Sequence, residues 1–432
     1  MTQTAPAPQN TQETSSKSRD KQGLGRTTWA QWPRYNEAAE GFRNYWYPVF
    51  WSRDIKAGKP YPLRLIGEDM MLFREPTTGK VHAMRDRCPH RGVPLSDGGT
   101  QEFPGTFSCP YHGWSFNLES GRLDAVITDG PKSPLCGKVF QRVFPTEERL
   151  GLVWVYVGDG ENVPPVEADI PAELVDNKNL TIGGRITVRE ANWRYGTENG
   201  YDEGHAKFLH RRAWLVQTLG IPLGVWNNVK TVMSEDGIWS TRVESNLEYE
   251  GEFPGVGRWP RKEPWFLRIR KNKQNLPGRD SEADQQNVDP AILALNSPGT
   301  VSVRMPCTLR VLMAPTWIHY EWCIGVDEEH YRYIQLAVQF KSDRRSALKF
   351  KAMYASLLTW MFHGQFTGQD ESMVRVTSAP PERLYRPDAS IIGWRNLCET
   401  ARTADGIEPE EPSKVDRPRS RELRGLTRKS GV

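Results

Sequence analysis

Two well-separated groups of metal-ligand residue types constrain this 432-residue chain more than any other feature. The first group places one cysteine and one histidine on each of two short segments, Cys88–His90 and Cys109–His112. The second group lies within 199–210 and contains an aspartate and two histidines. Together the groups hold four of the chain's eight histidines. The fold is therefore expected to build two separate metal sites.

The first group is a mixed set of two thiols and two imidazoles. Zinc can bind such a set, but zinc fingers gather their cysteines in one arm and their histidines in the other. Here each segment supplies one of each, which favours a two-iron cluster with one iron on Cys88 and Cys109 and the other on His90 and His112. Neutral imidazole ligands raise the reduction potential of such a cluster. It would accept electrons readily and pass them on singly.

The second group offers Asp202, His205 and His210. Asp202 and His205 are three residues apart and share a helix face. His205 and His210 are five apart, about 140° around an ideal α-helix, so they would not converge on one metal. If both bind one iron, the helix must end or carry a π-type irregularity between Ala206 and His210. Two histidines and one carboxylate are the recurring ligands of non-haem iron oxygenases.

The first segments resemble the Rieske [2Fe–2S] domain of ring-hydroxylating oxygenases, in Cys88-Pro-His-Arg-Gly and Cys109-Pro-Tyr-His-Gly-Trp. The gap at 91–108 is at the long end of that family's range. Asn192-Trp193, Glu198-Asn199-Gly200 and Asp202-x-x-His205-x-x-x-x-His210 look like the catalytic motif of the α subunits. The resemblance implies a Rieske cluster on the four cysteine and histidine residues named above, and a mononuclear Fe(II) on His205, His210 and Asp370.

The same resemblance implies roles for the neighbours of these ligands. Asp202 would bridge a Rieske histidine and His205, and Asn199 would lie near the iron. Glu371 is the competitor of Asp370 for the third ligand position. Phe366 and His363 precede Asp370 by four and seven residues. They are candidates for the substrate pocket, with a packed aromatic and a structural histidine as the plainer interpretations.

The opening Gly41-Phe-Arg-Asn-Tyr-Trp-Tyr-Pro48 is similar to the carbazole dioxygenase and 2-oxoquinoline monooxygenase group, which lacks β subunits. In the carbazole enzymes the two iron histidines are one residue closer together than here. The group implies a head-to-tail homotrimer, with His112 of one chain near Asp202 of the next. It also implies a ferredoxin or an NAD(P)H-dependent reductase as electron donor.

Hydrophobic periodicity predicts an α+β chain: an all-β N-terminal domain, then a domain of helices on an antiparallel sheet. The expected divisions are a loosely ordered segment at 1–40, a Rieske domain at 41–160, a catalytic domain at 161–408 and a basic tail at 409–432. Within the catalytic domain, helical patterns span 193–210 and 344–376. The polar composition of residues 271–298 predicts a surface insertion.

Net charge and hydropathy argue against a nucleic-acid-binding protein and against a membrane-spanning one. The net charge of +4 comes from Ser413–Val432, which holds seven basic and two acidic residues, so no nucleic-acid partner is expected. No run of eighteen apolar residues is present, so no membrane span is expected. Without an export signal, the six cysteines are expected to stay reduced in the cytoplasm.

The function predicted from these patterns is a terminal oxygenase. It would use O₂ and electrons relayed through the Rieske cluster to hydroxylate an aromatic or heteroaromatic small molecule. Oxidation of an alkyl or N-methyl group, including quaternary amines, is the alternative within the oxygenases. A cage of tryptophans near the iron would favour that alternative. An electron-transfer Rieske protein without catalysis is the alternative of another class, although it would not need His205, His210 and Asp370.

Overall fold

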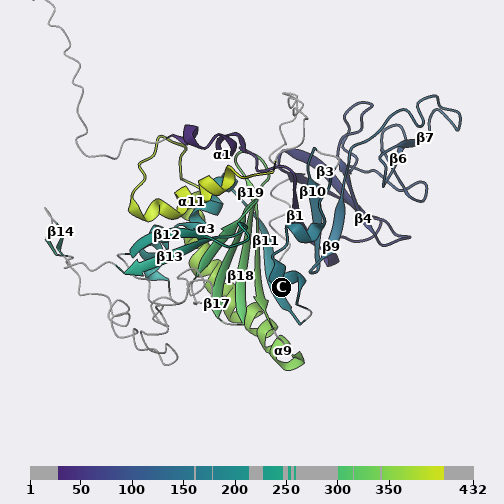
Figure 1. Ribbon diagram of the computed structural model, residues 1–432. Coiled ribbons are helices and arrows are strands. Elements are labelled where there is room, and N and C mark those ends of the chain that lie inside the picture. Colours follow the sequence, from purple (N-terminus) through teal and green to yellow (C-terminus); the bar gives the residue numbers. More distant parts are fainter. Residues whose placement is uncertain are drawn as a thin grey trace, which may run out of the picture.

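The structure is a computed structural model, and it describes residues 28–159, 162–177, 179–213, 227–246, 252–253, 257–258, 300–314, 316–340 and 343–402. An all-β N-terminal part lies beside a larger part in which helices cover an antiparallel sheet (Figure 1). The expected α+β class is thereby confirmed. The predicted insertion at 271–298 and basic tail at 409–432 lie outside the described residues. In the described ranges, no helix has the length and apolar character that crossing a membrane requires.

The N-terminal part consists of three antiparallel sheets. The sheet next to the catalytic part has the order β1 (Tyr45–Trp51), β10 (Leu152–Val157), β9 (Thr146–Arg149). The second has the order β2 (Pro60–Leu65), β3 (Glu68–Arg74), β4 (Val81–Arg85), β8 (Val143–Phe144). The third, at the far end, has the order β5 (Thr106–Ser108), β6 (Trp114–Asn117), β7 (Leu123–Val126).

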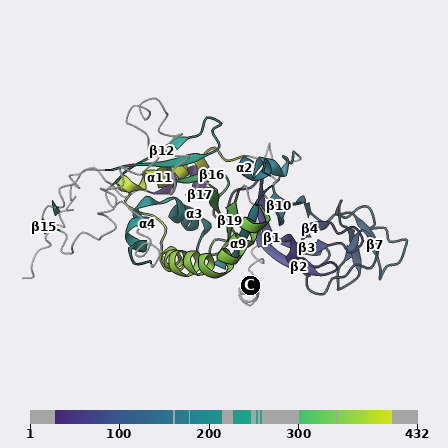
Figure 2. The ribbon, with the colours of Figure 1, turned by 90° about the horizontal axis from the view of Figure 1, so that it is seen from below.

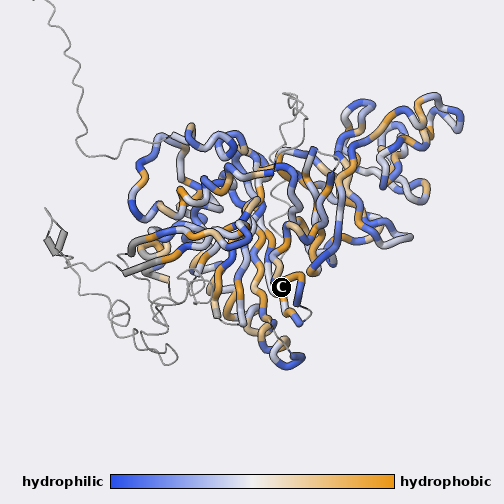
Figure 3. Tube along the Cα trace, viewed as in Figure 1, coloured by the Kyte–Doolittle hydropathy of each residue, from blue (hydrophilic) through white to orange (hydrophobic). Residues whose placement is uncertain are grey.

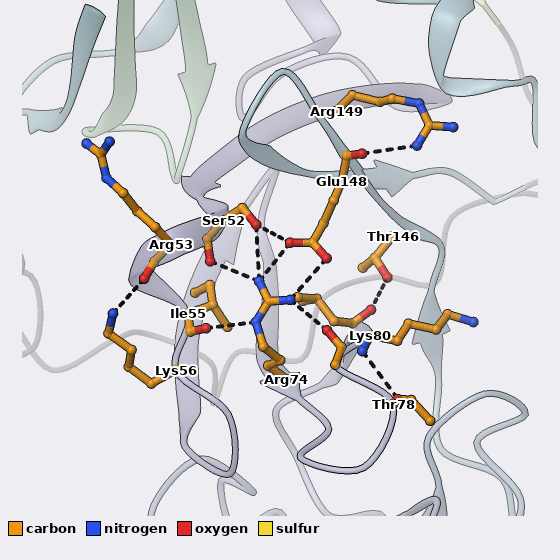
Figure 4. Close-up of polar contacts among 12 residues, drawn as sticks. Ser52, Arg53, Ile55, Lys56, Arg74, Thr78, Lys80, Thr146, Glu148 and Arg149 are labelled. Carbon is orange, nitrogen blue, oxygen red and sulfur yellow. Dashed lines mark hydrogen bonds and ion pairs between the residues drawn. The ribbon is translucent and has the colours of Figure 1, made fainter.

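Arg74 joins the first two of these sheets, as Figure 4 shows. It lies on β3, and its Nη2 contacts Oε1 of Glu148 on β9 at 2.7 Å. The same guanidinium donates to the carbonyls of Ser52 and Ile55, both at 2.9 Å. A planar five-donor fork suits this task, because it can satisfy one carboxylate and two carbonyls at once. Lysine at this position could not make all these contacts.

Strand β10 explains why one stretch of the sequence is continuously apolar. All six residues of Leu152–Val157 are buried. The strand pairs with β1 on one side and β9 on the other. Trp154 on β10 also packs against Trp322 of the catalytic part, with ring centroids 6.1 Å apart. A strand covered on both faces has no solvent side, so polar and apolar residues do not alternate along it.

A seven-stranded antiparallel sheet organises the catalytic part, and its central strands carry many hydrophobic residues (Figure 3). Its order is β11 (Thr181–Arg189), β19 (Tyr331–Gln339), β18 (Trp317–Gly325), β17 (Thr308–Ala314), β16 (Val301–Arg304), β13 (Ser240–Asn246), β12 (Asn227–Met233). A separate short pair joins β14 (Glu252–Phe253) to β15 (Gly257–Arg258).

Helices cover this sheet, and the longest runs across one face when the molecule is seen from below (Figure 2). The helices that position the site are α3 (Trp193–Tyr201), α4 (Glu203–Phe208), η4 (Leu209–Arg212), α9 (Arg344–Met353), η6 (Tyr354–Phe366), α10 (Thr367–Val374) and α11 (Ala389–Cys398). The shorter ones are η1 (Trp29–Gln31), α1 (Pro33–Glu37), η2 (Ser52–Asp54), η3 (Val166–Ala168), α2 (Ala172–Val175) and η7 (Arg386–Asp388).

The part of the predicted loosely ordered segment 1–40 that the structure describes, residues 28–40, packs against the rest of the protein. Trp29, Trp32, Tyr35 and Ala38 are buried and belong to the main core. The guanidinium of Arg395 on α11 lies over all three rings, at 4.9 to 5.7 Å from their centroids. The aromatic side chains therefore anchor a segment whose polar composition had suggested looseness.

The single helix predicted for 193–210 is divided in two. Asp202 has an extended backbone, with φ −69° and ψ 133°, and it separates α3 from α4. Its carboxylate accepts the backbone N–H groups of Gly204 at 2.8 Å and His205 at 2.9 Å. Aspartate is a favoured N-cap because its side chain satisfies donors that the first helical turn leaves free. The helical pattern of the sequence continues on both sides of Asp202, so it predicted one helix and gave no sign of this cap.

The long C-terminal helix matches its prediction closely. α9, η6 and α10 form one uninterrupted helical run from Arg344 to Val374. Its middle segment, η6, is a π-helix of 13 residues. Inside it, the Thr359 hydroxyl donates to the carbonyl of Tyr354. Directly after it, the hydroxyl of Thr367, the first residue of α10, donates to the carbonyl of Phe362. Each of these bonds joins residues five apart, which is the spacing that a π-helix brings together.

Candidate metal centres

Three of the predicted ligands meet at one point. His205, His210 and Asp370 each offer one ligand atom, and these atoms lie within 4.8 Å of one another. Oδ1 of Asp370 is 3.5 Å from Nε2 of His205 and 3.1 Å from Nε2 of His210. Among the described residues, no other group of three histidine, cysteine or acidic side chains lies so close. The geometry is that of a site for a single metal ion.

A change of helix type brings the two histidines together. α4 ends at Phe208, and the chain continues as the tighter 3-10 turn η4 from Leu209 to Arg212. The ring centroids of His205 and His210 are consequently 5.4 Å apart. The expected break between Ala206 and His210 is confirmed, because a continuous α-helix would have turned the two rings apart.

The two adjacent acidic side chains on α10 face different partners. Asp370 faces the histidines, whereas Glu371 forms an ion pair with Arg189 on β11. Burial acts to raise the pKa of Asp370, but the neighbouring imidazoles and Asn199 act against it, and the pKa is lowered overall. The carboxyl group therefore stays ionised, as a metal ligand must. Asn199 lies beside this carboxyl group, as the resemblance implied.

Each histidine is oriented through its second ring nitrogen. Nδ1 of His205 lies 3.1 Å from Oδ2 of Asp202, and Nδ1 of His210 lies 3.0 Å from Oε1 of Gln369. In both contacts the Nδ1–H group of the histidine donates to an oxygen atom. Each Nε2 therefore keeps its lone pair for a metal. Gln369 was missed in the sequence, although its position directly before the predicted ligand Asp370 was a usable signal.

The donor set fits a ferrous ion. Two neutral imidazoles and one carboxylate leave further coordination positions open. Oδ1 of Asp370 is buried and makes no hydrogen bond within the described residues. A buried ionised oxygen without a donor is costly, so it calls for a cation at this point.

The cysteine and histidine pairs lie on two loops with the same backbone pattern. In the first, the N–H of Cys88 donates to Val93 and that of Gly92 donates to Cys88. In the second, Cys109 donates to Trp114 and Gly113 donates to Cys109. Both glycines have a positive φ, and at Gly113 a Cβ atom would lie 2.7 Å from Ile127. The loops thus present their ligands from matching tight turns.

The two thiols face each other and the two imidazoles face each other. Cys88 and Cys109 are buried, and the hydrogen bond between them lowers the pKa of Cys109 to about 6 while raising that of Cys88. The rings of His90 and His112 have centroids 4.7 Å apart. Nδ1 of His112 is buried without a hydrogen-bond partner in the described structure. A thiol pair opposite an imidazole pair fits a binuclear cluster with unlike irons.

The two candidate centres lie at opposite ends of the subunit. The loop that carries Cys109 and His112 leads directly into β6, and β6 and β7 form one end of the molecule (Figure 1). Figure 2 shows α4, which carries His205, towards the other end. Direct electron transfer between the two centres of one subunit would have to cross most of the molecule.

The two residues considered for the pocket have different surroundings. The Phe366 ring lies 4.7 Å from that of His210, so it borders the metal site. His363 is buried, and its Nε2 lies 3.0 Å from the Tyr354 hydroxyl. Burial, followed by Arg185, lowers the pKa of His363 to about 3, so its imidazole is uncharged.

Comparison with known families gives two matches. Residues 45–135 match the family described as Rieske [2Fe-2S] domain. Residues 156–407 match the family described as homotrimeric ring hydroxylase. The second match covers more than half of the chain and includes all three residues that meet around the site.

Relatives and solved structures agree with these matches. The chain is 32% identical to the terminal oxygenase component of carbazole 1,9a-dioxygenase from Sphingomonas sp, over 85% of this chain and 93% of that protein. It is 29% identical to the corresponding component from Metapseudomonas resinovorans, over 85% and 92%. A solved fluorene-bound oxygenase and ferredoxin complex of carbazole 1,9a-dioxygenase superposes with a TM-score of 0.70 at 26% identity, covering 86% of this chain and 94% of that one.

Proposed function

The chain belongs to the homotrimeric ring hydroxylases with an N-terminal Rieske domain, and from this we propose which of its residues carry the reaction. The protein is a terminal oxygenase with a Rieske [2Fe–2S] cluster and a mononuclear iron, and it hydroxylates an aromatic substrate. We assign the cluster to Cys88, His90, Cys109 and His112, and the iron to His205, His210 and Asp370. The meeting of the last three within 4.8 Å is the observation that supports the iron assignment.

The iron supplies the site at which O₂ is activated, and the protein holds its ligands in the protonation state that this requires. Nδ1–H of His205 donates to Asp202, and Nδ1–H of His210 donates to Gln369. These bonds fix the tautomers and orient both rings. Phe366 excludes water from one side of His210 and offers an aromatic face to a substrate ring.

Electrons reach the iron from a neighbouring subunit. The separation of the two centres within one chain supports this route (Figure 2). We assign Asp202 as the bridge: one carboxylate oxygen faces His205, and its side chain remains partly exposed. In the head-to-tail trimer it would accept a hydrogen bond from the partner subunit's His112, because Nδ1 of this histidine has no hydrogen-bond partner among the described residues of one subunit.

The electron donor is a ferredoxin, an NAD(P)H-dependent reductase, or both in sequence. The solved relative is a complex of the oxygenase with a ferredoxin, which supports the first. A cytoplasmic location fits such donors, because a reducing compartment keeps cysteines available as cluster ligands. Cell fractionation with an antibody to the chain tests the location.

Substrate oxidation tests the function as a whole. The purified protein, supplied with a ferredoxin and reductase, is incubated with carbazole, fluorene and a quaternary methylamine under O₂. We expect O₂-dependent hydroxylated product from a ring compound, since the phenyl ring of Phe366 lies 4.7 Å from that of His210 and can pack against an aromatic substrate. Formaldehyde release from the methylamine, with no ring product, would instead assign the N-methyl oxidation considered from the sequence.

A further inference from the structure

One face of the seven-stranded sheet, covered by the helix run 344–374, carries an unusual set of polar side chains. Register places Arg185 of β11 opposite Gln335 of β19, and Gln335 opposite Glu321 of β18. Paired residues point to the same face of a sheet. A Cβ atom at Gly183 would lie 2.8 Å from the Tyr354 ring, so this face is the one under the helix.

This face has an apolar half. Trp317 and His319 of β18 contact the Phe362 ring, with centroids 5.6 Å away in both cases. Phe362 contacts Phe366 at 6.3 Å, and Phe366 contacts the iron ligand His210 at 4.7 Å. A series of aromatic rings therefore leads from the iron site along the sheet.

The other half is polar and poorly satisfied. Four buried nitrogen or oxygen atoms of alternate residues on β11 have no hydrogen-bond partner in the described structure: Arg185 Nε, Thr187 Oγ1, Arg189 Nε and Arg189 Nη2. All four can donate a hydrogen bond. Native proteins leave few such atoms unpaired, and each costs about 1–3 kcal/mol. Gln335 Oε1 is an unpaired acceptor nearby. Donors therefore outnumber acceptors on this face, and the described residues supply no acceptor for them.

Arg185 differs from the other cationic residues of this face in having no acidic partner among the described residues. The other cationic groups of this face have acids: Arg189 pairs with Glu371, and His319 contacts Glu321 at 2.9 Å. No ion pair or hydrogen bond links Arg185 to any acid in the described structure, and its Nε is buried. Burial, followed by the charge of Arg189, lowers its pKa. A largely buried guanidinium beside the guanidinium of Arg189 favours the binding of an anion.

The site adjoins the iron centre. Gln335, directly opposite Arg185, donates from Nε2 to the hydroxyl of Thr367 at 3.2 Å. Thr367 lies one helical turn before the ligand Asp370. We propose that the substrate of this oxygenase is an aromatic carboxylate, whose ring lies along Phe366 and Phe362 and whose carboxylate is bound by Arg185. This inference rests on the proposed function, since it names the substrate class of the same site.

Binding of matched aromatic probes tests the proposal without any turnover. Naphthalene-2-carboxylate and naphthalene-2-carboxamide share one ring system and differ in charge. Titrated against the purified holoprotein and followed by tryptophan fluorescence, the carboxylate is expected to bind about 10- to 100-fold more tightly. In Arg185→Gln this preference is expected to fall to a few-fold, and in Arg185→Lys to an intermediate value, because lysine keeps the charge and loses the fork.

Arg332→Gln is the matched control. Arg332 lies on β19 of the same sheet, but on the opposite face, where it donates to the carbonyl of Val49 and lies over the Phe50 ring. It is also buried. We expect this variant to keep the full preference for the carboxylate. A second readout is thermal unfolding without ligand: Arg185→Gln should not lower the midpoint, since an unsatisfied buried guanidinium is removed.

The outcomes separate this inference from the proposed function. Equal binding of carboxylate and amide to the wild type would overturn it, and so would a preference that survives in Arg185→Gln. If neutral rings are hydroxylated and no carboxylate preference exists, the oxygenase function stands and the substrate class falls. If the preference exists and depends on Arg185, but no ring compound is oxidised, the recognition site stands and the proposed reaction falls.

Discussion

Nδ1 of His210 lies 3.0 Å from Oε1 of Gln369, the residue directly before the proposed ligand Asp370. One turn of α10 therefore supplies both an iron ligand and the group that orients another ligand. Replacing Gln369 by leucine should lower the affinity for ferrous iron about 10- to 100-fold, the usual cost of losing such a partner. Iron retention during dialysis against a chelator measures this, with the exposed Met373→Ala as control. Unchanged retention in Gln369→Leu would contradict the positioning role.

Removal of His210 should separate the two metal centres. We expect His210→Ala to keep the visible and EPR spectra of the reduced cluster, because the cluster ligands lie at the other end of the subunit (Figure 2). Product formation should fall below detection. His330→Ala removes a histidine whose imidazole lies 2.9 Å from Asp327, and it should retain activity. Product formation by His210→Ala would refute the iron assignment.

Asp202→Asn isolates the charge of the proposed bridge. Through its single side-chain oxygen, asparagine can accept one of the two helix-capping bonds that Asp202 accepts with its two oxygens. Asparagine is itself a favoured N-cap, so α4 should remain folded. We expect both metals to stay bound, while oxidation of the cluster in a single turnover with substrate and O₂ slows about 10- to 100-fold. Stopped-flow absorbance follows the cluster directly. Asp236→Asn, in an exposed turn, controls for the loss of one negative charge. A normal rate in Asp202→Asn would remove the bridge.

Asp388 should make the protein less stable as the pH rises. Burial raises its pKa from 3.8 to about 6, and the carboxylates of Asp202, Glu382 and Glu198 act in the same direction. The folded state favours protonated Asp388, so ionising this carboxyl group lowers the free energy of unfolding. This loss is absent below the unfolded pKa, grows as the pH rises to about 6 and is complete above it. Asp388→Asn keeps an acceptor for the N–H of Tyr385 and should stabilise the fold by about 1–3 kcal/mol at pH 8.

The same substitution should have a smaller effect at pH 5, where part of the Asp388 population is protonated. Thermal unfolding of both proteins at the two pH values measures the difference. An equal gain at pH 5 and pH 8 would show that the Asp388 carboxyl group titrates normally.

Both proposed metal sites could be predicted from the sequence because all their ligands except Asp370 are chemically rare residues grouped at short spacings. The distance of five residues between His205 and His210 even required the helix to change type before His210, as it does at Phe208. The choice between Asp370 and Glu371 could not be made in this way. Adjacent helical residues point about 100° apart, and only the packing of α10 against α3 and η4 decides which one faces the histidines.

Strand β18 was not predicted, although it lies near the centre of the sheet. In the sequence Trp317-Ile-His-Tyr-Glu-Trp-Cys-Ile-Gly, alternate residues form one apolar and aromatic face, whereas the other face mixes Trp317 and Cys323 with His319 and Glu321. His319 and Glu321 point to the polar face under the helix, where they contact each other. Periodicity assumes that buried faces are apolar, so a buried polar face hides a strand from it.

The placement of the two metal centres at opposite ends of the subunit has a genetic consequence. A chain that lacks the cluster, such as Cys88→Ser, and a chain that lacks the iron, such as His210→Ala, would each be inactive alone. In a mixed ring, however, the intact cluster of the second chain stands beside the intact iron of the first. Two null alleles expressed in one cell would therefore complement each other, and a recessive defect at either centre could be masked by a different defect at the other.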